Sequence, residues 1–335
     1  SMVAAVLTAG GLDPTVVIGG KLKGMGTNAF LGKGDFLVAE ADESDGSFLK
    51  MSPAVAVVTN IDLEHLDHYR DLAHITDCFA RFVDRVPFYG VSIVCLDSPA
   101  VADLLPRVNR RCLTYGLSAQ ADFRAVEVRT DRFSTSFGVL SGGRNLGRVT
   151  LNLPGRHNVH NALAAVAVGC ELGVDFSKTA EALKNLEGVH RRLEIRGEKN
   201  GVTVVDDYGH HPTEIAATLQ TLRECWPDRR MVVAFQPHRY TRTAALFEDF
   251  SRSFYQADEV VILPVYPAGE APIPGIDAVS LCKAVAARGH KAAFCVRDFD
   301  EALAHLRERV GENAVLLTLG AGNVHELCPR FLEDA

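Results

Sequence analysis

Short, almost uninterrupted apolar runs constrain the fold of this chain more than any other feature of its sequence. The runs AVAVVTNI (54–61) and VSIVCL (91–96) are typical of parallel strands that are covered on both faces. An amphipathic helix is expected between them, at 71–86. The elements expected before them are a helix at 2–10 and strands at 15–20 and 36–42. This alternation predicts an α/β fold, doubly wound around a parallel sheet.

The pattern changes in the segment 122–153, where polar and apolar residues alternate with period two and predict an antiparallel meander. An Ala-rich helix that ends at Gly173 follows it. A second series of alternating strands and helices follows. Its strands are expected at 202–208, 230–237, 259–266, 291–296 and 314–322, and its helices at 213–225 and 243–256. We therefore expect two domains: residues 1–192, with a parallel sheet plus the meander, and residues 193–335, with a Rossmann-like α/β sheet.

Composition excludes several classes of protein. The formal net charge of -7 argues against broad binding to nucleic acid or to an anionic membrane, because both need a basic face. None of the eight cysteines forms a CxxC pair, so zinc-ribbon spacing is absent from the sequence. No run approaches the ~18 apolar residues of a membrane span, and no signal segment is recognisable. These features predict a cytoplasmic protein without nucleic-acid partners or membrane insertion.

Two strand ends carry groups that could bind a metal ion. The run AEADESD (39–45) follows one expected strand, and TNIDLEHLDHY (59–69) follows another; their carboxylates and imidazoles are Glu40, Asp42, Glu43, Asp45, Asp62, Glu64, His65, Asp67 and His68. Ligand sites in open α/β sheets lie at the carboxyl ends of strands, and Mg²⁺ prefers oxygen ligands. The alternatives are a solvated acidic turn, a helix cap, and a zinc hydrolase, which the absence of HExxH disfavours.

A third group of polar residues precedes the Ala-rich helix. In PGRHNVHNA (154–162), Asn158 and Asn161 could donate to and accept from an adenine edge, although helix capping alone would explain one of them. The HRR segment (190–192) is suited to polyphosphate, because one guanidinium group can donate two parallel hydrogen bonds to the oxygens of a phosphate. An interdomain salt bridge is the alternative for these arginines.

Two further polar segments, DDYGHHPTE (206–214) and FQPHRYTRT (235–243), each follow an expected buried strand. Side by side they would form an electropositive pocket suited to carboxylate and phosphate, unless the residues are simply exposed. The sequence contains no GxxxxGK[ST] phosphate-binding loop.

Taken together, these segments resemble the Mur ligases. The similar stretches are GLDPT, AEADESDGSFL, VVTNID with EHLDHY, LPGRHNVHNALAA, HRR, VDDYGHHPTEI, FQPHRYTRT and VYPAGEAPIPG, which occur in this order over nearly the whole chain. The resemblance implies a central ATPase domain followed by a Rossmann-like ligase domain. It also implies that a UDP-binding domain and a phosphate-binding loop precede this segment in the intact protein, so we expect the chain alone to be inactive.

The resemblance further implies an ATP- and Mg²⁺-dependent reaction that joins L-alanine to the carboxylate of UDP-N-acetylmuramate through an acyl phosphate. Glu40 and His65 would hold Mg²⁺, Asn158 and Asn161 would contact adenine, Asp207 the ribose and Arg192 the phosphates. His210, Arg239 and Arg242 would line the pocket for the muramoyl group and alanine. No lysine occurs between Lys50 and Lys178, so no carbamylated lysine is expected there. The alternatives are a murein-peptide recycling ligase and a non-catalytic nucleotide-binding remnant.

Overall fold

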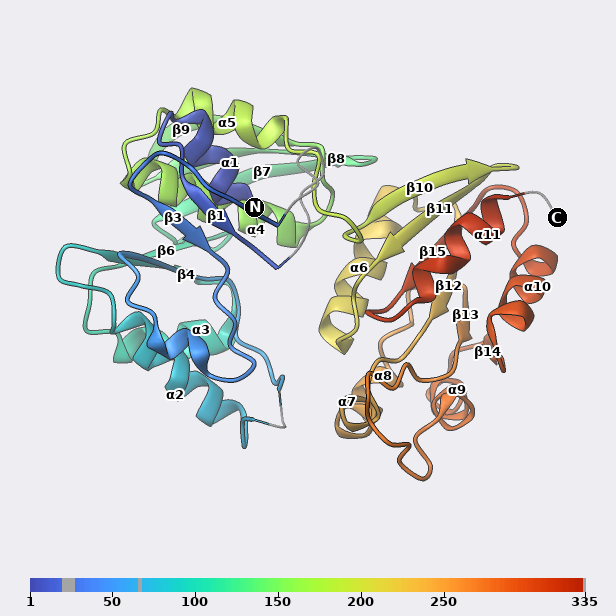
Figure 1. Ribbon diagram of the computed structural model, residues 1–335. Coiled ribbons are helices and arrows are strands. Elements are labelled where there is room, and N and C mark those ends of the chain that lie inside the picture. Colours follow the sequence, from blue (N-terminus) through green and yellow to red (C-terminus); the bar gives the residue numbers. More distant parts are fainter. Residues whose placement is uncertain (20–27, 66–67, 334–335) are drawn as a thin grey trace. The chain divides into compact units, whose positions relative to one another are not determined.

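A computed structural model describes residues 1–19, 28–65 and 68–333 (Figure 1). The chain divides into two compact units, Ser1–Val189 and His190–Ala335. The sequence analysis placed this boundary three residues later, at 192. None of the helices in the described ranges is long and apolar enough to cross a membrane.

The first unit contains a six-stranded sheet in the order β4-β5-β6-β7-β8-β9. Its strands are β4 (Val55–Val58), β5 (Val91–Cys95), β6 (Cys112–Gly116), β7 (Phe123–Asp131), β8 (Ser134–Ser141) and β9 (Arg144–Leu151). The pairs from β4 to β7 are parallel, and β7, β8 and β9 pair antiparallel. The prediction of a parallel sheet that continues into an antiparallel meander is therefore confirmed.

Both faces of this sheet are covered. Alternate residues of β5 belong to different cores: Ile93 packs with α1 (Met2–Ala9) and α4 (Arg156–Glu171), whereas Val94 packs with α2 (Leu72–Val83) and α3 (Pro99–Leu104). This two-sided burial explains why the strand is apolar at every position except Ser92, whose hydroxyl donates to the carbonyl of Val83. Helix α5 (Phe176–Lys184) packs against α1, α4 and β9.

The two earliest predicted strands belong to a separate, three-stranded sheet in the order β2-β1-β3. Its strands are β1 (Thr15–Val17), β2 (Ala29–Phe30) and β3 (Leu37–Ala39), with β1 parallel to β3 and antiparallel to β2. Residue 20, the last of the predicted strand at 15–20, lies outside the described residues. A short 3-10 helix, η1 (Ser47–Lys50), follows the acidic turn.

The second unit contains a six-stranded sheet in the order β10-β11-β15-β12-β13-β14. The five predicted strands are present as β11 (Val202–Asp207), β12 (Arg230–Phe235), β13 (Glu259–Ile262), β14 (Ala293–Cys295) and β15 (Ala314–Leu319). They pair in parallel, and β10 (Glu194–Lys199), which the sequence analysis missed, adds an antiparallel edge. The predicted Rossmann-like α/β domain is confirmed.

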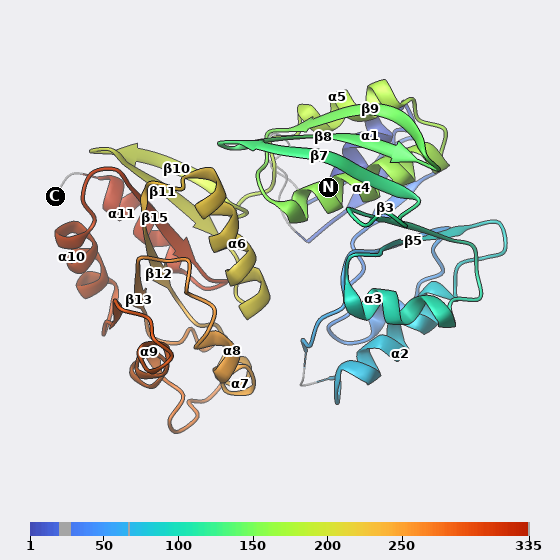
Figure 2. The same cartoon turned by 180° about the vertical axis from the view of Figure 1, so that it is seen from behind.

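Helices cover both faces of the second sheet. Helices α10 (Phe299–Arg309) and α11 (Leu327–Leu332) pack on one face, and Figure 2 shows α6 (Pro212–Cys225) on the other. The remaining helices are α9 (Ala278–Ala287), η3 (Val324–Glu326), α7 (Tyr240–Ala245) and α8 (Phe247–Phe250). The last two replace the single helix predicted at 243–256. Because β11, β12 and β15 are parallel and in register, the loops that follow them lie together at the carboxyl ends of these strands.

Candidate functional site

The first cluster of functional groups lies in the loops that follow β3 and β4. Nε2 of His65 is 3.3 Å from Oε1 of Glu43 and 3.9 Å from Oε2 of Glu64. One ligand atom of each of the three residues lies within 4.8 Å of the others. His65 has a φ of 53°, in the left-handed region that few residues other than glycine adopt. Two carboxylates and an imidazole form a donor set that fits a divalent cation.

Glu40 makes a different set of contacts. Its Oε2 accepts a hydrogen bond of 2.8 Å from the N–H of Gly19, which ties the segment after β3 to the segment after β1. The structure therefore brings His65 together with Glu43 and Glu64 and places Glu40 outside that group. The role of Glu40 as a metal ligand stays a prediction, and Asp67 lies outside the described residues.

The two asparagines predicted to contact adenine lie on the first turns of α4, three residues apart and hence on the same helix face. Nδ2 of Asn158 donates to the carbonyl of Pro154 at 2.7 Å, which holds the turn that precedes the helix. Gly155 occupies that turn with a φ of 97°, a conformation that favours glycine. Asn158 is therefore not a helix cap, because its amide donates to a carbonyl and α4 has no side-chain cap hydrogen bond. Both adenine contacts remain predictions.

Asp97, which the sequence analysis did not single out, organises the same region. It follows β5 and accepts hydrogen bonds from the backbone N–H groups of Leu117 and Ser118 and from Oγ of Ser118. Nε2 of His160 lies 2.7 Å from its Oδ2. Burial would raise the pKa of Asp97, but the hydrogen bonds from Leu117, Ser118 and His160 outweigh it and lower the pKa to about 2. The sequence feature that could have identified Asp97 as a site residue is its position at the carboxyl end of a buried strand.

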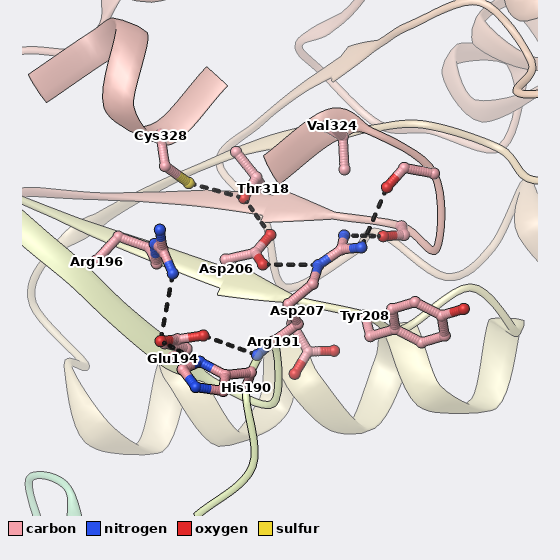
Figure 3. A network of polar contacts seen from close by, with 12 residues as sticks. His190, Arg191, Glu194, Arg196, Asp206, Asp207, Tyr208, Thr318, Val324 and Cys328 are labelled. Carbon is pink, nitrogen blue, oxygen red and sulfur yellow. Dashed lines mark hydrogen bonds and ion pairs between the residues drawn. The ribbon is translucent and has the colours of Figure 1, made fainter. Parts of the chain in front are cut away.

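In the second unit, the two adjacent arginines of the HRR segment have different environments, and Figure 3 shows that of Arg191. Arg191 donates from Nε to Asp206 at 2.9 Å and from its two terminal nitrogens to the carbonyls of Gly322 and Gly320. Asp206 is 1% exposed and also accepts a hydrogen bond from Thr318. Arg191 therefore connects the end of β11 to the loop after β15.

Arg192 is half-exposed and lies 3.3 Å from Oε1 of Glu214. Its guanidinium is 5.7 Å from the ring centre of Tyr208, within the range of a cation–π contact. Of the two arginines, Arg192 is thus the more exposed one, and its contact with phosphate stays a prediction.

Asp207, predicted to contact ribose, is buried and holds backbone in place. Its Oδ2 accepts from the N–H of Leu193 and its Oδ1 from the N–H of Gly209, both at 2.8 Å. Burial raises the pKa of Asp207, although Arg192 and these two N–H groups act in the opposite direction. These contacts give Asp207 a structural role, and its ribose contact remains a prediction.

Glu214 takes part in capping the N-terminus of α6. Its Oε2 accepts from the N–H of His210 at 2.9 Å, and with His211 it forms a capping box. Burial would raise the pKa of Glu214, but the positive charges of His210 and Arg192 hold it below its usual value. His210 is thereby positioned by its backbone, and its ring is 3.1 Å from the carbonyl of Tyr208.

The predicted neighbourhood of the DDYGHHPTE and FQPHRYTRT segments is present. A row of aromatic rings joins them, with centroid distances of 5.4 Å from Tyr208 to His210, 6.1 Å from His210 to His238 and 5.4 Å from His238 to Tyr266. Arg242 contacts His238, and Arg239 is exposed beside it with a φ of 68°. The structure therefore brings His210 and Arg242 together with His238, which the sequence analysis noted only as part of a motif.

Two α/β units, each with charged side chains in loops that follow strands, define a multidomain α/β protein. Residues 15–169 match the Mur ligase middle domain, and residues 191–322 match the glutamate ligase domain of Mur ligases. A UDP-N-acetylmuramate–L-alanine ligase from Desulfatibacillum aliphaticivorans is 60% identical over 99% of this chain and 73% of the relative. The chain belongs to the Mur ligase family, as its motifs predicted.

Solved structures agree with this assignment. The UDP-N-acetylmuramate–alanine ligase from Thermotoga maritima superimposes with a TM-score of 0.81 at 30% identity, covering 98% of this chain and 70% of that one. A murein peptide ligase from Psychrobacter arcticus superimposes with a TM-score of 0.70 at 22% identity, covering 99% and 73% of the two chains. The second similarity shows the shared fold alone.

Proposed function

We propose that this protein joins L-alanine to the carboxylate of UDP-N-acetylmuramate, with ATP as the source of energy, in peptidoglycan synthesis in the cytoplasm. The relative that is 60% identical over 99% of the chain carries this activity in its name. The observation that carries the proposal is the strand-end cluster of the second unit, where His210, His238 and Arg242 contact one another in sequence. Cationic and hydrogen-bonding groups of this kind suit a substrate carboxylate.

The proposed reaction has two steps. The substrate carboxylate attacks the γ-phosphorus of ATP, which forms an acyl phosphate and releases ADP. The neutral amine of alanine then attacks the acyl carbon, so that an amide bond forms, phosphate leaves and the amine loses a proton. The task of the protein is to position the reactants and to neutralise charge. We assign Arg239 and Arg242 to the anionic groups of the muramoyl substrate and alanine, and Arg192 to the phosphates of the nucleotide.

The metal proposal follows from the donor set of the first unit. Glu43, Glu64 and His65 would hold Mg²⁺, whose charge would offset that of the phosphates. Glu40, which contacts Gly19, would then act beside this group rather than within it. Asn158 and Asn161 remain the candidates for the adenine edge.

The test is phosphate release that depends on ATP, L-alanine and UDP-N-acetylmuramate. We propose that the full enzyme also has a UDP-binding domain and a phosphate-binding loop, so the assay compares this chain with a longer form that carries both. Activity of the longer form supports the proposal. If a well-folded longer form releases no phosphate in the presence of all three substrates, the proposal is contradicted.

A murein peptide ligase is the second candidate, because the solved peptide ligase shares the fold. Tyr208, Gly209 and the HRYTRT run favour alanine as the amine, according to the motif resemblance. Replacement of L-alanine by an alanyl peptide in the same assay separates the two candidates. Faster turnover with the peptide would favour the recycling reaction.

A further inference from the structure

His238 is held in one orientation by the segment around Tyr266, which lies beyond the end of β13. It forms an isolated parallel bridge with Tyr266, supported by backbone hydrogen bonds from Arg239 N–H to Tyr266 and from Tyr266 N–H to Pro237. The two rings stack with centroids 5.4 Å apart and planes 7° apart. A ring packed flat against another ring cannot turn freely, so its two nitrogens keep distinct surroundings.

The contact with Arg242 fixes the position of the ring proton. The NH1 nitrogen of Arg242 lies 3.3 Å from Nδ1 of His238. A guanidinium can donate hydrogen bonds but cannot accept them. Nδ1 must therefore be the acceptor, and the single proton of the neutral ring must lie on Nε2.

The surroundings of His238 also oppose a second proton. Burial lowers the pKa of His238, helped by the positive charges of Arg242, His210 and Arg239 and opposed by Glu270, to about 4. The ring is thus uncharged at neutral pH, even though it lies among cationic groups. Within the described part of the chain, no protein acceptor is hydrogen-bonded to Nε2.

We propose that His238 is an uncharged hydrogen-bond donor whose Nε2–H contacts an anionic oxygen of the carboxylate substrate or of its phosphorylated form. This inference rests on the proposed function and assigns a further substrate-contacting residue to the same pocket. The arginines already supply positive charge there. A neutral donor adds a hydrogen bond to the developing negative charge without further repelling the amine of the incoming amino acid, which arrives protonated.

The protonation state can be measured without any substrate. Nitrogen NMR of the histidine rings in the full chain, with the His238 signals identified by their loss in His238→Phe, reports which ring nitrogen carries the proton. We expect the Nε2–H form, unchanged between about pH 6 and pH 8, because the pKa lies well below that range. A ring protonated on Nδ1, or on both nitrogens, overturns the proposal.

Kinetics of the longer form in the alanine ligase assay test the role of the donor. His238→Phe keeps a flat ring against Tyr266 but removes the N–H, so we expect kcat to fall about 10²- to 10³-fold while the KM for ATP changes little. His238→Gln places an amide N–H near the position of Nε2, and we expect it to recover at least tenfold of the loss, roughly the contribution of one hydrogen bond.

Equal activity of His238→Phe and wild type would overturn the donor role, as would equal losses in the Phe and Gln variants. Thermal unfolding of both variants identifies any loss that comes from misfolding. The two proposals fail in different ways. An inactive longer form with the wild-type sequence contradicts the proposed ligase function, whereas the NMR result decides the protonation state of His238 in either case.

Discussion

The charged clusters of the two units are built in opposite ways. In the first unit, Glu43 and Glu64 approach His65 with side chains that are 39%, 29% and 23% exposed, in that order. In the second unit, Asp206 is 1% exposed and is paired with Arg191 and with Thr318. Two carboxylates beside one imidazole carry negative charge that an added cation could neutralise, whereas the charge of Asp206 is already neutralised by Arg191. The first cluster therefore suits a metal ion, and the second holds backbone loops in position before any ligand arrives.

The largest effect is expected for Asp206→Ala. Removal of Asp206 leaves the charge of Arg191 without its buried partner, and such losses cost about 3–5 kcal/mol in the free energy of unfolding. Chemical denaturation followed by the fluorescence of Trp226, the single tryptophan, reports on the second unit. The matched control is Asp300→Ala, whose carboxylate is 85% exposed beside Arg330 and should contribute less than about 1 kcal/mol. Similar losses in the two variants would show that the buried Asp206–Arg191 pair contributes no more to stability than an exposed ion pair.

Arg239→Ala should weaken substrate binding rather than stability. Loss of a cation that pairs with a buried substrate carboxylate costs about 2–5 kcal/mol, or roughly 30- to 1,000-fold or more in KM. We expect this increase for UDP-N-acetylmuramate or alanine, and little change for ATP. Arg297→Ala, at an 86% exposed arginine of the same unit, is the control. A defect confined to ATP would show that Arg239 belongs to the nucleotide site.

Metal dependence provides a sharper test of the first cluster. We expect His65→Ala and Glu43→Gln each to raise the Mg²⁺ concentration needed for half-maximal activity by at least about tenfold, since loss even of an outer partner of a metal ligand costs that much. Glu40→Gln should have a smaller effect, because Glu40 contacts Gly19 rather than His65. If Glu40→Gln has the larger effect, then Glu40 is the direct ligand and the cluster with Glu43 is incidental. Unchanged titration curves in all three variants would exclude a metal role for the cluster.

The smallest effect is expected at Asp97, where hydrogen bonds lower the pKa from 3.8 to about 2. A carboxylate with a lowered folded pKa stabilises the protein above its unfolded pKa, and this contribution is lost as the pH falls from about 4 to about 2. Asp97→Asn should lose this part of the acid sensitivity, worth about 1 kcal/mol because solvent screens the group. The measurement is the free energy of unfolding against pH. An identical acid slope in the variant would mean that His160 and Ser118 do not stabilise the charge.

Burial determined which elements could be predicted. The apolar runs of β5, β11 and β12 match their predicted segments closely, because strands covered on both faces consist mainly of apolar residues. The strand β10 was missed, since Glu194–Lys199 reads EIRGEK and is an edge strand with exposed residues. The helix predicted at 243–256 is broken at Leu246, between α7 and α8. Apolar spacing alone did not mark this break.

The candidate site follows the same division. The motifs of the second unit predicted a shared pocket, and the rings of His210 and His238 lie 6.1 Å apart. Spacing could not show that Asp207 is buried against Leu193 and Gly209, or that Glu43 rather than Glu40 accompanies His65. Those facts depend on which oxygen of a side chain meets which backbone N–H, after loops from distant segments have packed together.

By itself the sequence determined the family, the α/β class and the strand ends that carry polar groups, because these depend on local hydrophobicity and on short motifs. The tertiary structure alone decided how neighbouring residues of one type divide their roles. Arg191 and Arg192 are adjacent and identical in the sequence, yet one is bound to Asp206 and two carbonyls while the other is half-exposed beside Glu214. The physical reason is that burial and hydrogen-bond geometry are set by the packing of β11, β15 and α6, which no local pattern specifies.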